Sequence, residues 1–103
     1  MPTENEAAIK VIVELQAKPG KRAELKNLLE SVVTRLGPDE PGFLGSTRYE
    51  VLDNPNIVVE IADWASAEVR AAAMQKAMAS GAYAPLEDLL SAPFRATVIR
   101  QLP

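Results

Sequence analysis

The sequence predicts one α+β domain in which four strands form an antiparallel sheet and both long helices lie on one face of it. Three observations support this fold: apolar residues alternate near the N-terminus, leucines recur every three or four residues within residues 21–36, and a dense β-branched run at residues 57–62 leads into a second helical segment. The order is strand, helix, strand, strand, helix, strand within 103 residues. Two right-handed crossovers around a central hairpin bring this order into a single sheet.

The first crossover begins with a strand over residues 8–17, because alternate side chains there are apolar. The side chains on its apolar side are Ile9, Val11, Val13 and Leu15. Lys18-Pro19-Gly20 predicts a turn, since proline fixes φ and glycine relieves the backbone after it. A helix with one apolar stripe is expected over residues 21–36, and Gly37-Pro38 ends it.

A central hairpin is predicted from residues 43–52 and 57–64, joined by the turn Asp53-Asn54-Pro55-Asn56. The second of these strands is aliphatic at nearly every position, which predicts burial on both faces. It ends at Trp64, the only tryptophan, where the strand passes into a helix. One side of the first strand is expected to carry Phe43, Thr47, Tyr49 and Val51.

The second long helix is predicted over residues 67–80, with Ser66 as its N-cap and Gly81 at its end. It is rich in alanine and carries Met74 and Met78 four residues apart. Small residues leave room beside a helix, and methionine side chains adapt to irregular space. This helix is therefore a candidate wall for a ligand pocket, although core filling explains the same residues.

A short helical segment is expected within residues 83–90, and a last strand over residues 94–102. Several strands are apolar on both sides, so the sheet face away from the helices also needs a cover. A second copy of the chain is the simplest cover, and we expect a homodimer. The residues that indicate this second apolar face are Ile12, Val58 or Val59, and Ile99.

Length and composition indicate how the chain is organised and exclude several classes of function. Residues 1–7 are polar and are expected to be a flexible N-terminus ahead of one domain over residues 8–103. The net charge is −3 and no basic run exceeds Lys21-Arg22, so nucleic acid is not an expected partner. No apolar run approaches the ~20 residues of a membrane span, and no signal-peptide pattern is present. A cytoplasmic location without membrane contact is expected.

The chain contains no histidine and no cysteine. These residues supply the usual zinc, haem and iron–sulfur ligands and the common nucleophile–base pairs. The acidic residues are scattered without a ligand spacing, and the glycines match no phosphate-binding loop. The sequence therefore predicts a site with no metal and no cofactor.

The sequence resembles the antibiotic-biosynthesis monooxygenase family of dimeric α/β barrels over nearly its whole length. The resemblance rests on Lys18-Pro19-Gly20-Lys21, on Glu40-Pro41-Gly42-Phe43-Leu44-Gly45, on Trp64-Ala65-Ser66-Ala67-Glu68, and on Tyr83 before the last short helix. The tryptophan-to-glutamate step at the strand–helix junction is the most specific of these motifs. The resemblance implies a ferredoxin-like fold, a homodimer whose sheets face each other, and a pocket between sheet and helices in each subunit.

The resemblance also implies a chemistry. Members of the family often oxygenate phenolic, quinol or anthrone-like polycyclic substrates without a cofactor, because the substrate anion gives electrons to O₂ directly. Relatives that degrade haem use a histidine ligand, which this chain lacks. Two positions differ from the common family pattern: Ala62 stands where a glutamate is usual, and Ala73-Met74 stands where a histidine is usual.

The candidate catalytic residues are Trp64, Tyr83 and Glu60, and the candidate substrate-binding residues are Trp64, Met74, Met78, Tyr83 and Arg48. Trp64 could stack on a flat ligand or fill the edge of the core. Tyr83 could bind a substrate oxygen or close the core. Arg48 could hold a phenolate or form a salt bridge with Glu50 or Glu14.

Two hypotheses from different classes follow. The first is a small cofactor-independent monooxygenase acting on a polycyclic phenol, quinol or anthrone-like aromatic. The alternative is a non-catalytic dimeric barrel that binds a small apolar ligand or acts as an assembly module; the missing histidine and Ala62 favour it. An isomerase or a lactone-handling enzyme is a third option.

Overall fold

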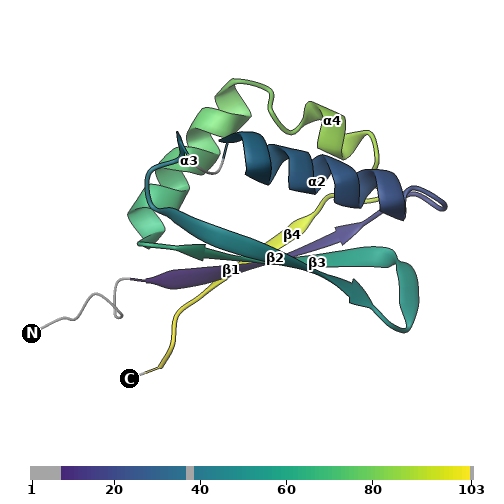
Figure 1. Ribbon diagram of the computed structural model, residues 1–103, viewed down its shortest axis with the longest axis horizontal. Helices are drawn as coiled ribbons and strands as arrows, with labels where there is room; N and C mark the ends of the chain where they lie inside the picture. The colour runs from purple at the N-terminus through teal and green to yellow at the C-terminus, as the bar shows by residue number, and fades with distance from the viewer. Residues whose placement is uncertain (1–7, 37–38, 103) are drawn as a thin grey trace, which may run out of the picture.

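The computed structural model describes residues 8–36 and 39–102. One antiparallel sheet has the strand order β2-β3-β1-β4, and the helices lie together on one side of it (Figure 1). The elements are β1 (Ile9–Gln16), α2 (Arg22–Leu36), β2 (Phe43–Val51), β3 (Asn54–Trp64), α3 (Ala67–Ala79), α4 (Ala84–Glu87) and β4 (Arg95–Ile99). This arrangement confirms the α+β, ferredoxin-like βαββαβ fold that the sequence predicts. The predicted flexible segment 1–7 and the helix stop at 37–38 lie outside the described residues.

The core lies between the helices and the alternate side chains of β1 and β3. Directly opposed residues of antiparallel strands share a face, and the pairs Ile9–Trp64, Val11–Ala62 and Leu15–Val58 all face the helices. Each of these six side chains is at most 6% exposed. The predicted apolar side of the first strand is therefore correct, and it forms the floor beneath α2 and α3.

The predicted two-sided pattern of β2 is wrong at Phe43. Phe43 pairs with Trp64 but Gly45 pairs with Asp63, so one extra residue interrupts the alternation. Gly45 has φ +132°, a conformation that side chains disfavour. Beyond this bulge Tyr49 lies on the outer face, 46% exposed, whereas Phe43 packs inward against the core.

Other helix and strand boundaries differ from the predicted ones by a few residues. β3 begins at Asn54, so the hairpin turn is centred on Leu52 and Asp53 rather than spread over residues 53–56. The Asn54 side chain accepts a hydrogen bond from the Asn56 amide at 3.0 Å, which stabilises an extended start to the strand. The last strand stops at Ile99, three residues earlier than predicted, and the last helix is a single turn, Ala84–Glu87.

No element of residues 8–36 and 39–102 covers the sheet face away from the helices. β3 is therefore buried on one face only, and Ile57, Val59 and Ile61 on its other face are only half-buried. Ile99 lies on the edge strand β4, beside β1, and is 39% exposed. No helix among the described residues is long and apolar enough to cross a membrane.

Candidate functional site

A cavity of about 370 Å³ lies between the sheet and the helices. Its floor consists of inward side chains of β1 and β3, one wall comes from the leucines and valines of α2, and the opposite wall comes from α3. Tyr83, the start of α4 and Phe94 close the remaining side. A volume of this size lies within the usual range of small-molecule sites.

The α3 wall follows one face of the helix. Arg70, Ala73, Met74 and Ala77 line the cavity at spacings of three and four residues, which places them on one side of an α-helix. The two alanines have little bulk, so the cavity extends up to the helix backbone. The predicted pocket wall on this helix is therefore present.

Two local features fix the start of this wall. The Ser66 hydroxyl accepts a hydrogen bond from the Val69 amide at 3.2 Å, as expected of an N-cap. Gly42 packs directly on the helix: a Cβ at this position would lie 2.3 Å from Val69 Cγ1. The Gly42 carbonyl also accepts from the Ala65 amide at 2.8 Å, so the loop before β2 holds the junction between β3 and α3.

Trp64 belongs to both the core and the cavity. Its side chain is 6% exposed and packs edge-on against Phe43, with ring centroids 5.1 Å apart and an interplanar angle of 64°. It also contributes to the cavity wall at the end of β3. Both interpretations of Trp64 therefore describe its position, and its contact with a ligand stays a prediction.

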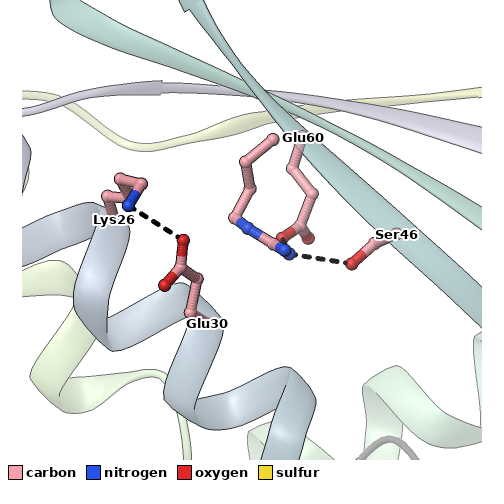
Figure 2. A network of polar contacts seen from close by, with 5 residues as sticks. Lys26, Glu30, Ser46 and Glu60 are labelled. Carbon is pink, nitrogen blue, oxygen red and sulfur yellow. Dashed lines mark hydrogen bonds and ion pairs between the residues drawn. The ribbon is translucent and has the colours of Figure 1, made fainter.

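Glu60 brings a carboxyl group into the largely apolar cavity. Arg48 Nη1 lies 3.4 Å from Glu60 Oε2 and donates to Ser46 Oγ at 3.1 Å. Figure 2 labels Glu60 and Ser46, and it also draws the exposed Lys26–Glu30 pair of α2. Burial raises the pKa of Glu60, and the nearby Arg48 guanidinium only partly offsets this.

Arg48 does not line the cavity, which corrects its predicted role in substrate binding. It lies beside Glu60 on the neighbouring strand, because the sheet register pairs these two residues. The alternative salt bridge with Glu50 or Glu14 does not form within the described chain, since Arg48 pairs with Glu60 and Glu50 pairs with Arg22 at 3.6 Å. Arg48 therefore acts on the site through the carboxyl group of Glu60.

Tyr83 closes one side of the cavity. Its hydroxyl donates to Met74 Sδ at 2.8 Å, and its ring packs on Phe94 at a centroid distance of 5.6 Å. Burial raises the pKa of the Tyr83 phenol; the positive charge of Arg70 opposes this and the negative charge of Glu60 adds to it. The charges of Arg70 on α3 and of Glu60 on β3 thus both act on the phenol of Tyr83.

Met78 is a second correction. It is 71% exposed and does not line the cavity. Met78 lies about a quarter-turn around the helix from the middle of the Arg70–Ala77 stripe, so its side chain projects sideways into solvent. Of the predicted binding residues, Trp64, Met74 and Tyr83 line the cavity, as does the candidate base Glu60.

The sequence prediction missed Arg70 and Phe43. Arg70 lies four residues before Met74, so the helical spacing that singled out Met74 also indicated Arg70. Phe43 could not be placed without the bulge at Gly45. Among residues 8–36 and 39–102, no three acidic side chains gather closely enough to hold a metal ion.

The family model described as antibiotic biosynthesis monooxygenase matches residues 8–84. The chain belongs to this family. Some of its members are monooxygenases, many have no known function, and its proteins are commonly dimeric. No curated protein matches the chain significantly.

Solved structures confirm the fold. A conserved protein from Methanosarcina mazei Go1 is 22% identical, with a TM-score of 0.81 over 96% of this chain and 97% of the other. A protein of unknown function from Nitrosomonas europaea is 24% identical, with a TM-score of 0.77 over 96% and 93%. SnoaB, a cofactor-independent oxygenase from Streptomyces nogalater, is 16% identical, with a TM-score of 0.77 over 92% and 93%.

Proposed function

We propose that this protein is a cofactor-independent monooxygenase whose substrate is a flat, electron-rich phenol, quinol or anthrone-like aromatic. The observation that carries the proposal is the Glu60 carboxyl in an apolar cavity, with its pKa raised by burial. A carboxylate with a raised pKa is a stronger base than one in water, and it suits proton removal from a weakly acidic ring carbon or phenol. Family membership and the cofactor-independent oxygenase SnoaB support the same chemistry.

The reaction balances without an external reductant. For an anthrone-like ring, Glu60 takes a proton from the CH₂ carbon, and the resulting enolate gives electrons to O₂ as a carbon–oxygen bond forms. The peroxide anion takes the proton back from Glu60. Loss of water, with breakage of the O–O bond and the remaining C–H bond, then leaves a ketone. The sum is R₂CH₂ + O₂ → R₂C=O + H₂O, in which four electrons pass from substrate to oxygen.

The other cavity residues would bind and orient the ring. Trp64 at one end and Met74 on α3 offer apolar and polarizable contacts to a flat surface. Tyr83 lines the cavity, and its hydroxyl would exchange the Met74 sulfur for a substrate oxygen as hydrogen-bond partner. Walls made of aliphatic side chains exclude water, which protects the enolate from protonation by solvent.

Oxygen uptake with anthrone and a naphthoquinol tests the proposal. Protein dialysed against chelator should raise the rate above spontaneous oxidation, and Glu60→Gln should lower that increment at least ~100-fold, the usual scale of general-base catalysis. Glu24→Gln, which changes an exposed glutamate of α2, is the matched control and should keep full activity. Wild-type activity in Glu60→Gln, or activity that returns only with iron or flavin, would contradict the proposal.

The alternative function is a non-catalytic barrel that binds an apolar ligand. The Arg48–Glu60 ion pair favours it, because a guanidinium beside a carboxylate reduces its basicity. Ligands of the same panel would then perturb the Trp64 fluorescence while oxygen uptake stays at the spontaneous rate. Titrating both signals with the same compounds separates the two functions.

A further inference from the structure

The charges around the cavity do not balance. Glu60 has Arg48 at 3.4 Å, and Glu40, also in the wall, has Lys76 at 3.6 Å. Each of these acids therefore has its own cation. Arg70 lines the cavity as well, yet none of the ion pairs in the described part of the chain includes it. Among the side chains that the structure describes, the Arg70 guanidinium is thus a cation of the cavity wall with no ion-pair partner.

The position of Arg70 directs this charge towards the ligand space. Arg70 lies one turn before Met74 on the cavity face of α3. Its charge acts on the Tyr83 hydroxyl, which is bonded to the Met74 sulfur. A thioether is a weak acceptor, so Tyr83 can exchange this bond for one to an anionic oxygen at little cost. Arg70 and Tyr83 therefore form a pair of donors at one place in the wall.

We propose that the ligand of this cavity is an aromatic carboxylic acid whose single carboxylate lies between Arg70 and Tyr83. Its rings then lie along the alanine stripe of α3, over Ala73 and Ala77. This inference rests on the proposed function for the identity of the site and adds the charge of its substrate.

Physical chemistry favours an anion at this place. A guanidinium next to apolar walls is poorly hydrated, and an ionised partner restores the lost interactions with short, charge-assisted hydrogen bonds. Glu60 does not repel such a ligand strongly, because its pKa is raised and Arg48 neutralises its ionised form. The ligand charge would also keep the reacting ring in one orientation, as a single anchoring group does in a mostly apolar pocket.

Binding of 2-naphthoate and of its neutral methyl ester, measured by calorimetry and by Trp64 fluorescence, tests this inference without any turnover. The wild type should bind the acid at least ~10-fold more tightly than the ester at pH 7, the scale of one charge-assisted hydrogen bond. Arg70→Met should lower the affinity for the acid about 10-fold and leave that for the ester unchanged, and Arg70→Lys should restore part of the difference. Arg100→Met, at an exposed arginine outside this cavity, is the matched control.

Each outcome is decisive. Equal affinity for acid and ester, no binding of the acid, or an equal loss for both compounds in Arg70→Met would overturn the inference. The wild-type comparison needs no variant, so a poorly folded Arg70→Met does not prevent the test. Oxygen uptake is measured separately, and a protein that binds the acid through Arg70 but consumes no oxygen would contradict the proposed function alone.

Discussion

Glu60 is subject to two opposing influences. Burial disfavours its ionised form and Arg48 favours it, and the net direction of the pKa is upward. The folded protein therefore binds the Glu60 proton more tightly than the unfolded chain does. The stabilisation that results is complete below the unfolded pKa of about 4.3, and it is lost as the pH rises through the folded pKa.

Glu60→Gln should remove this pH dependence. Glutamine keeps the size of the side chain and an acceptor for Arg48, but it cannot ionise. We expect the wild type to lose stability relative to Glu60→Gln as the pH rises above the unfolded pKa of about 4.3, and the variant to be at least as stable as the wild type once Glu60 has ionised. Urea unfolding of both proteins, at pH values from about 4 upwards, measures this difference in stability. Parallel stability curves for the two proteins would assign the pH dependence to another group.

At the scale of elements, α3 and its junction with β3 decide the shape of the site. The helix packs on the sheet through small residues, and the cavity exists because Ala73 and Ala77 leave space that larger residues would fill. A helix with leucine at these positions would belong to an ordinary packed core. The alanines at these positions thus leave space for a ligand, and the helix packs less fully against the sheet as a result.

Ala77→Leu tests this by partly filling the cavity. The added side chain buries apolar surface in existing space, so the free energy of unfolding should change by no more than about 1 kcal/mol and is expected to rise. Ligand affinity should fall at least ~10-fold, because the leucine occupies the place of the ring. Ala72→Leu, at an exposed position of the same helix, should alter neither quantity. Unchanged affinity in Ala77→Leu would mean that ligands bind elsewhere.

The elements themselves could be predicted because each has a clear period or boundary signal. The spacing of apolar residues indicated Arg22–Leu36, and Ser66 indicated the start of α3. Which side chains reach the site depended on features that have no such period or boundary signal in the sequence. The bulge at Gly45 turned Phe43 inward, and the strand register, rather than sequence proximity, placed Arg48 beside Glu60. Met78 was misplaced because a four-residue spacing alone does not show which side of a helix faces the sheet.

At the scale of the whole molecule, the described residues leave one face of the sheet uncovered. Ile12, Ile61 and Thr47 lie side by side across β1, β3 and β2 on this face, with Val59 and Tyr49 next to them. An apolar sheet face in contact with water is unfavourable, and a second copy of the same face would bury it symmetrically. The helices lie on the opposite side (Figure 1), so pairing through this face leaves both cavities intact.

We therefore expect a homodimer that buries more than ~1,000 Å² in total through the outer sheet face. Ile61→Glu places a charge near the centre of this face, where two copies would bring like charges together away from water. The dimer dissociation constant should rise about 100-fold or more. Sedimentation equilibrium of the wild type and the variant measures this, with Met78→Glu on the exposed side of α3 as the matched control. A wild-type protein that sediments as an 11.1 kDa monomer at micromolar concentration, or an Ile61→Glu dimer as stable as the wild type, would show that this face is not the interface.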